Sequence, residues 1–321
     1  MSISLICTLL VLSWASCVNA AGLDLSPIDT TTFSLYVALA AYTLFQTYRA
    51  FAILLRLQPK AGSDSLPVPR DRVPYIKIFL ATLTCLICYI LLTIWIPIDL
   101  SMHSVGAQYH NTFYAMMATD QLSDIFIASG LLHFIDNRRD DLGRAHGDAN
   151  PLTIYSMSST KKRTLDTIML YFMAMVIIAN VIVGAVLTRT VSDPDAARAA
   201  YSSLYHVYLA LYTIAAINVA LSAWFLWRSL PKTAASTERT TQIILKRVVP
   251  LLIVRVLFKL SVDIVTSAPI SLNINYDALE LIEAIVESLT YAVIIYSTLG
   301  LARPIQWEEI KGEKSQGEDN I

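Results

Sequence analysis

Charged side chains are scarce in this chain of 321 residues: they make up 15% of it, whereas apolar side chains make up 55% and the mean hydropathy is +0.54. A water-soluble domain is usually about a quarter charged. Here the apolar residues gather in stretches of about 20, which is the length that crosses a bilayer. This composition argues against a soluble protein and predicts that lipid surrounds most of the chain.

Cysteines are few, and basic residues do not outnumber acidic ones. Of the four cysteines, Cys7 and Cys17 fall in a leader segment, and Cys85 and Cys88 lie within an apolar stretch, where we expect them to pack as small apolar residues. No disulfide framework outside a membrane is therefore expected. The net charge of −1 offers no basic surface for nucleic acid, so no nucleic-acid partner is predicted. No cofactor is predicted either.

The first 20 residues have the features of a signal peptide. Residues 3–14 are an apolar core, and Val18 and Ala20 occupy the small-residue positions that signal peptidase favours. We expect cleavage after Ala20. The alternative is an uncleaved first helix, because the first two residues carry no lysine or arginine.

Seven apolar segments of spanning length follow, and each is expected to be helical because lipid offers backbone polar groups no other partner. The predicted fold class is therefore all-α: a polytopic membrane protein, with a cleaved signal peptide (1–20), a seven-transmembrane-helix bundle (21–301) and a cytosolic tail (302–321). The predicted spans are residues 33–55, 76–98, 112–134, 165–187, 202–227, 248–270 and 278–301.

Lysine and arginine residues are concentrated in every second connection. The first, third and fifth connections are basic, the fourth has two such residues, and residues 21–32, 99–111 and the sixth connection have none. The positive-inside rule places the basic connections in the cytosol and the mature N-terminus outside. The basic residues are Arg56, Lys60, Arg70, Arg72 and Lys77; Arg138, Arg139, Arg144, Lys161, Lys162 and Arg163; and Arg228, Lys232, Arg239, Lys246 and Arg247. A secretory-pathway membrane is predicted, with the plasma membrane favoured.

Ionisable residues inside the predicted spans cost a few kcal/mol each near the bilayer centre and are functional candidates for that reason. They recur at helical spacing, so that each set lies on one helical face. The third span holds Asp120 and Asp124; the sixth holds Arg255, Lys259 and Asp263; the seventh holds Glu280, Glu283 and Glu287.

Depth along the helices predicts which of these residues meet. Counting about 1.5 Å per residue from the outer ends places Lys259 level with Glu287 and Asp263 level with Glu283. We expect the third, sixth and seventh helices to converge on a polar cavity in the outer half of the bundle, with Lys259 paired to Glu287 and Arg255 near Asp124. The alternative is that these groups only fix helix packing.

Metal and amide sites are weaker candidates. His103, His110 and His206 lie near the predicted outer surface, and histidine with carboxylate binds zinc, but no HxxxH or HExxH spacing is present. No metal site is therefore predicted. Asn180 and Asn218 in the fourth and fifth spans are expected to make hydrogen bonds between helices.

The topology resembles that of G-protein-coupled receptors: seven helices, an outer N-terminus and basic inner loops. The motifs of rhodopsin-like receptors are absent. Residues 133–139 read His-Phe-Ile-Asp-Asn-Arg-Arg where those receptors carry an acidic-Arg-aromatic triplet, and residues 291–296 lack an Asn-Pro-x-x-Tyr element. The seventh span has no lysine, which excludes a retinal Schiff base placed as in opsins.

The functional prediction is a receptor-like or ligand-sensing membrane protein, more in keeping with a binding protein than with an enzyme. Its expected partners are the lipid bilayer, a small molecule or ion from the outer side, and a cytosolic partner at basic residues such as Arg138, Arg139 and Arg144. A proton- or ion-linked transporter is the first alternative, because acids outnumber bases in the spans. An intramembrane metal-dependent hydrolase is the second.

Overall fold

The computed structural model describes residues 27–57, 72–102, 107–145, 159–190, 194–229, 239–267 and 276–302, and no strand occurs among them. The predicted signal peptide, nearly all of the predicted tail and His103 lie outside the described residues. The elements are α2 (Pro27–Arg56), α3 (Arg72–Met102), α4 (Ala107–Ala145), α5 (Ser159–Thr190), α6 (Pro194–Ser229), α8 (Arg239–Ile243), the π-helix η1 (Ile244–Val248), α9 (Val249–Ser267), α10 (Tyr276–Leu299) and the 3₁₀ turn η2 (Gly300–Ala302).

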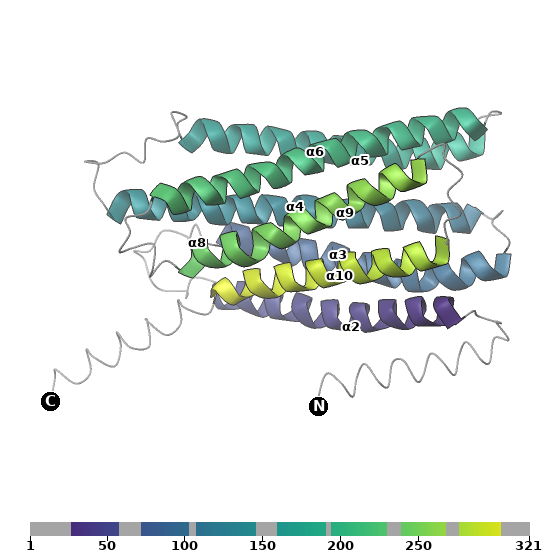
Figure 1. Ribbon diagram of the computed structural model, residues 1–321, viewed down its shortest axis with the longest axis horizontal. Coiled ribbons are helices and arrows are strands. Elements are labelled where there is room, and N and C mark those ends of the chain that lie inside the picture. The colour runs from purple at the N-terminus through teal and green to yellow at the C-terminus, as the bar shows by residue number, and fades with distance from the viewer. Residues whose placement is uncertain are drawn as a thin grey trace.

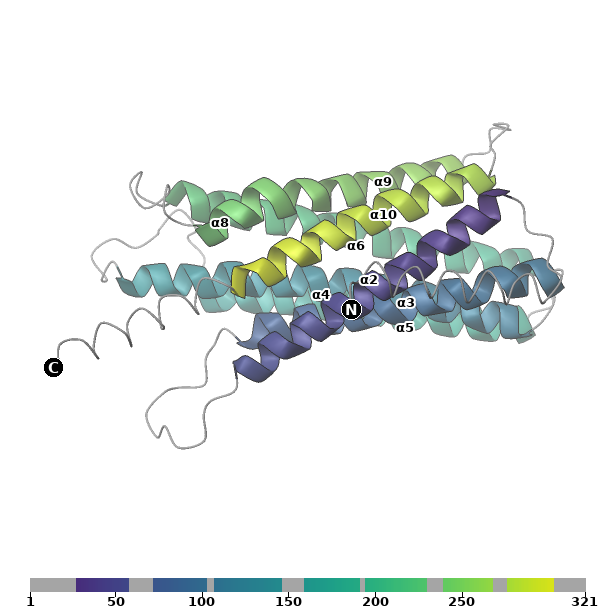
Figure 2. The ribbon, with the colours of Figure 1, turned by 90° about the horizontal axis from the view of Figure 1, so that it is seen from below.

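The long helices form one elongated bundle in which successive helices run in opposite directions (Figure 1). Each packs against the next, and α10 returns to pack against α2 and α3. α4 lies centrally, in contact with α3, α5 and α6, while α9 packs between α6 and α10. Figure 2 shows α2 crossing its neighbours at an angle. This arrangement brings α4, α9 and α10 to one interior region.

The helices extend beyond the predicted spans because hydropathy falls at polar residues while helical hydrogen bonding continues through them. Pro27 and Pro194 are the first residues of α2 and α6, where a missing N–H costs nothing. The sixth predicted span corresponds to η1 and α9. In η1 the Val249 N–H donates to the Ile244 carbonyl, and Pro250, which has no N–H, follows directly.

Five helices are long and apolar enough to cross a membrane: residues 27–56, 72–96, 161–185, 199–228 and 281–299, which lie in α2, α3, α5, α6 and α10. The predicted spans in α4 and α9 are not among these five; the first carries Asp120 and Asp124, and the second carries Arg255, Lys259 and Asp263. All seven predicted segments overlap described helices, but seven crossings and a signal peptide stay predictions. The structure shows a bundle whose described elements are all helical, and five of its helices are apolar and long enough to span a membrane.

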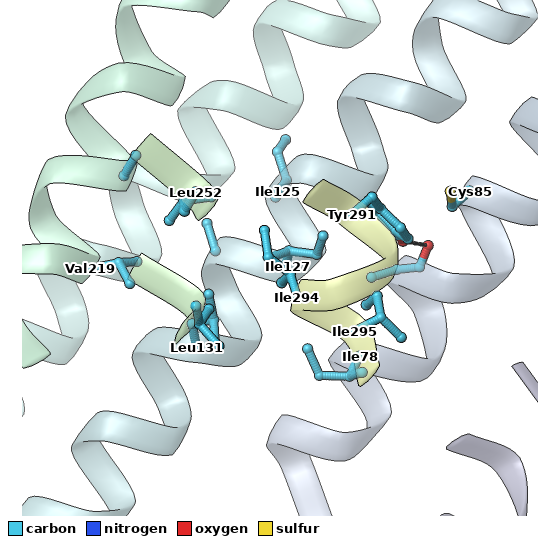
Figure 3. Packing of buried hydrophobic residues seen from close by; sticks show 14 of the residues in the cluster. Ile78, Cys85, Ile125, Ile127, Leu131, Val219, Leu252, Tyr291, Ile294 and Ile295 are labelled. Carbon is cyan, nitrogen blue, oxygen red and sulfur yellow. Dashed lines mark hydrogen bonds between the residues drawn. The ribbon is translucent and has the colours of Figure 1, made fainter. Parts of the chain in front are cut away.

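Apolar side chains from every long helix fill the interior, as the close view in Figure 3 shows for ten labelled residues. Cys85 and Cys88 are free and buried in α3, as expected from their apolar setting. Tyr291 links α10 to α3 by donating its hydroxyl to the Ala81 carbonyl at 2.6 Å. The outward faces carry large apolar side chains, which suits a lipid surrounding.

Candidate functional site

α4 and α9 face each other through two carboxylates and two cations. Asp120 and Asp124 lie one turn apart on α4, and Arg255 and Lys259 lie one turn apart on α9. Arg255 donates from Nε to Asp124 Oδ1 at 2.9 Å and from Nη2 to Asp120 Oδ1 at 3.0 Å. Lys259 Nζ donates to Asp120 Oδ2 at 2.6 Å and to Asp124 Oδ2 at 2.8 Å. The equal spacing on both helices lets each cation bridge both carboxylates.

Glu287 on α10 is a third carboxylate and is held more loosely. Its Oε2 lies 3.7 Å from Arg255 Nη2 and its Oε1 lies 3.8 Å from Lys259 Nζ, which are ion-pair distances too long for hydrogen bonds. Its side chain is 17% exposed, whereas that of Asp124 is fully buried. The Glu287 carbonyl, by contrast, accepts a hydrogen bond from Arg255 Nη1 at 2.9 Å. We refer to Asp120, Asp124, Arg255, Lys259 and Glu287 as the charge cluster.

Two tyrosines of α6 border the charge cluster. Tyr208 donates its hydroxyl to Asp124 Oδ2 at 2.8 Å, and its ring stacks on that of Tyr212 with centroids 6.0 Å apart. Lys259 Nζ lies 5.9 Å from the Tyr212 ring centroid. The Tyr212 hydroxyl is buried and has no hydrogen-bond partner among the described residues. A buried hydroxyl normally has a partner, so this one is suited to bind a further polar group.

The charges of the cluster do not balance. Three carboxylates face two cations, a formal charge of −1. Taking ions out of water is costly, and mutual attraction offsets that cost only where the geometry is good. Asp124 meets this condition because Arg255, Lys259 and Tyr208 all donate to it. Glu287 does not, so it is the carboxylate best placed to take up a cation or a proton.

The two predicted pairs are confirmed. Arg255 pairs with Asp124, and Lys259 lies within ion-pair distance of Glu287, although it is closer to Asp120. Asp263, by contrast, lies 3.1 Å from His206 Nε2 on α6. The predicted level of Asp263 with Glu283 stays a prediction, and its carboxylate pairs with a residue of α6.

The structure describes the side chains of only some of the remaining predicted site residues. Glu283 lies one turn from Glu287 on α10, close enough for its charge to act on that carboxylate. The side chains of Glu280 and His110 lie outside what the structure describes, although both positions are helical. Among the described residues, no group of three or more histidine, cysteine or acidic side chains is arranged to hold a metal ion.

A second polar region, at the predicted cytosolic end, was not foreseen. Lys162 and Asp166 on α5 are buried and paired at 2.7 Å, and the Asn218 amide of α6 donates to Asp166 at 2.7 Å. Asp136 of α4 is also buried, 3.3 Å from Arg139 and 3.8 Å from Arg163. The sequence pattern assigns Lys162, Arg139 and Arg163 to the third connection, because a charged helix end has the composition of a loop.

The predicted interhelical bond of Asn218 is confirmed by its contact with Asp166. The corresponding prediction for Asn180 is not confirmed: its side-chain oxygen is buried in α5 without a hydrogen-bond partner among the described residues. A composition-based expectation treats both amides alike. Only the position of a partner on a neighbouring helix distinguishes them.

An apolar layer separates the charge cluster from the second polar region. Ile127 and Leu131 of α4, Val219 of α6, Leu252 of α9 and Ile294 of α10 belong to this part of the buried apolar cluster, and all five are almost completely buried (Figure 3). Along α4, Asp124 and His133 are nine residues apart, or about 13 Å. The layer keeps the two polar regions apart in the structure described.

No family model, no curated protein and no solved structure matches the chain. The class of protein therefore follows from the fold and the site. Five apolar helices of spanning length around a buried cluster of ion pairs are features of a multi-pass membrane protein.

Proposed function

We propose that this chain is a seven-span integral membrane protein of a receptor-like, ligand-sensing type, and that its charge cluster binds a small cationic ligand from the outer side. The proposal places the protein in a secretory-pathway membrane, the plasma membrane above all. It is carried by one observation: Glu287 is a poorly satisfied carboxylate in a cluster with an excess of negative charge.

A cation beside Glu287 would bring the cluster to neutrality. Asp120 and Asp124 already accept hydrogen bonds from Arg255 and Lys259 of α9, so their carboxylate oxygens have partners. Glu287 keeps its carboxylate oxygens free of hydrogen bonds among the described residues. A buried carboxylate without a full partner is unfavourable, and ligand binding removes that penalty.

The aromatic surroundings favour an organic ammonium over a bare metal ion. The rings of Tyr208 and Tyr212 lie beside the cluster, and aromatic faces attract ammonium groups. The Tyr212 hydroxyl adds an unfilled hydrogen-bonding group. Tyr205 lies close enough to Glu287 and Glu283 for their charges to act on it. Small primary or quaternary amines combine the charge and the apolar surface that such a site recognises.

The test compares thermal unfolding of the purified protein in lipid nanodiscs with tetramethylammonium, methylammonium and sodium chloride at equal ionic strength. We expect an organic ammonium to raise the unfolding midpoint of the native protein. Glu287→Gln should abolish this rise because it removes the unsatisfied charge. Asp140→Asn is the matched control, since it makes the same change in a partly exposed carboxylate near the other end of α4. Equal ammonium effects in all three proteins would refute the proposal.

A proton-linked transporter is the second candidate, and the same surplus carboxylate favours it, because Glu287 could exchange a proton instead of a cation. Such a carrier would acidify the lumen of proteoliposomes under an imposed gradient, as read by a trapped pH-sensitive dye. Uptake that Glu287→Gln abolishes and Asp140→Asn retains would favour the transporter over the ligand sensor. No uptake in the native protein would exclude it.

A further inference from the structure

The second polar region holds one more cation than its carboxylates can pair. Asp166 pairs with Lys162, Asp136 pairs with Arg139 and Arg163, and Asp140 pairs with Arg163. These three carboxylates thus face three cations. Lys77 of α3 is a fourth cation, and it makes no ion pair with a carboxylate of the described residues.

Lys77 points between α3 and α4 rather than away from the bundle. Its Nζ donates to Ser129 Oγ at 2.5 Å and lies 2.9 Å from His133 Nδ1. The same Nδ1 is 3.1 Å from the Ser129 carbonyl. One ring nitrogen cannot donate to that carbonyl and also accept from the ammonium. With Nδ1–H donating to that carbonyl, Nε2, 3.3 Å from Lys77 Nζ, is the ring nitrogen that accepts from the ammonium. The half-buried Lys77 ammonium thus has a hydroxyl and an imidazole as partners among the described residues, and neither carries a negative charge.

The backbone brings these groups together at a close approach of α3 and α4. A Cβ on Gly130 would lie 2.8 Å from Ile78 Cδ1 and 3.5 Å from the Pro74 carbonyl oxygen. The absence of that Cβ lets the helices meet beside Lys77 and Ser129. A further positive charge is that of Arg163, which acts on both Lys77 and His133. Asp136 opposes it from α4.

We propose that Lys77, Ser129 and His133 form a binding site for a phosphate-bearing anion. An ammonium and a hydroxyl are donors that suit phosphate oxygens, and charge-assisted bonds of this kind are strong where water is limited. The His133 ring positions the ammonium through its Nε2. The site lies at the end of the bundle that the charge pattern assigns to the cytosol, the side of the membrane where anionic phospholipids are enriched. The phosphate can belong to a lipid headgroup or to a soluble phosphate, and the experiment separates these sources.

The site has its own residues: none of Lys77, Ser129 and His133 makes a hydrogen bond or ion pair with a member of the charge cluster among the described contacts. It also does not depend on the ammonium ligand proposed above. Loss of ammonium binding in Glu287→Gln would therefore leave phosphate binding unchanged. Failure of either proposal is distinguishable from failure of the other.

The first experiment tests a lipid headgroup as the source of the phosphate. The full chain is placed in phosphatidylcholine nanodiscs with a minor fraction of phosphatidic acid, and native mass spectrometry counts the phosphatidic acid that stays bound. We expect Lys77→Gln to weaken retention roughly tenfold, the loss of about one charge-assisted bond. Lys161→Gln is the matched control, because Lys161 is exposed at the same end of the bundle. Ser129→Ala removes a single oxygen and should weaken retention in a protein that still folds if Lys77→Gln does not.

The second experiment tests a soluble phosphate. It compares the thermal unfolding midpoint of the protein in detergent with inorganic phosphate and with chloride at equal ionic strength. Stabilisation by phosphate that Lys77→Gln removes supports the site and assigns it to soluble phosphate. Retention of phosphatidic acid without that stabilisation supports it and assigns it to a lipid headgroup. Equal losses in Lys77→Gln and Lys161→Gln, or no effect of either anion on the native protein, would overturn the proposal.

Discussion

At the residue scale, the main feature of the charge cluster is that each of two cations bonds to the same two carboxylates. Arg255 and Lys259 each contact both Asp120 and Asp124, so that removal of one cation affects every remaining member. In such a network the effects of single changes are not additive. A buried ion pair is also most destabilising when only one partner is removed.

Lys259→Met should therefore lower the free energy of unfolding by roughly 3 kcal/mol, because it leaves three carboxylates with one cation. Lys259→Met combined with Asp120→Asn should lose less than Lys259→Met alone, since one unpaired charge is removed as well. Reversible unfolding in a titration with sodium dodecyl sulfate measures both. If the double variant is at least as unstable as Lys259→Met alone, the residues do not act as one network.

Several of these residues could be assigned from the sequence and others could not. Spacing of three and four residues identified the faces of α4, α9 and α10, and depth alone paired Arg255 with Asp124. Depth carries no information about rotation, so the partner of Asp263 was missed. Lys77 and Lys162 were missed for another reason: at the end of a span, a buried lysine and a loop lysine have the same sequence context.

At the scale of the helix, small residues decide how closely neighbours pack. Gly184 of α5 faces the Tyr114 ring of α4, and a Cβ there would lie 2.3 Å from Tyr114 Cε1. Gly300, just after α10, has no atom within 4 Å of a Cβ built in the same way. Helices in membranes rely on such close contacts because lipid supplies no hydrophobic drive between them.

Gly184→Ala should therefore destabilise the protein by about 1–3 kcal/mol, because the Tyr114 ring must move out of a packed position. Gly300→Ala should leave stability nearly unchanged. Adding Tyr114→Leu to Gly184→Ala should restore part of the loss by making room. Thermal unfolding of the four proteins in one detergent compares them, and equal midpoints for the two alanine variants would contradict the close contact.

Helix positions were predictable because apolar runs of spanning length have one stable backbone form in lipid. Helix ends were not, since α4 extends to Ala145 through charged residues that close the apolar run. The π-helix η1 could not be foreseen either. Pro250 indicated a missing N–H at the start of the sixth span, but not how the preceding turn would widen to bond Val249 to Ile244.

At the scale of the whole molecule, the arrangement of helices makes a testable statement about sidedness. With seven crossings and an outer N-terminus, the end of α9 lies outside and the start of α5 lies inside. Ser267 and Lys161 are exposed at these two places. The native Cys85 and Cys88 are buried, so they contribute little background to labelling of introduced cysteines.

A cysteine introduced by Ser267→Cys should react with a membrane-impermeant maleimide on intact cells. Lys161→Cys should react only after the cells are permeabilised. Mass-tag gel shifts on the two variants measure this directly, with the unsubstituted chain as background. Labelling of Lys161→Cys on intact cells, or equal labelling of both, would contradict the proposed orientation.

The apolar layer beneath the charge cluster has an electrical consequence. A membrane potential falls mainly across the driest part of a protein, and one elementary charge moved through 100 mV gains about 2.3 kcal/mol. If the layer formed by Ile127, Leu131, Val219, Leu252 and Ile294 is the thinnest insulator along the bundle, most of the voltage falls there. A cation that stops at Glu287 then crosses only a small part of that voltage, so its affinity should depend little on the resting potential.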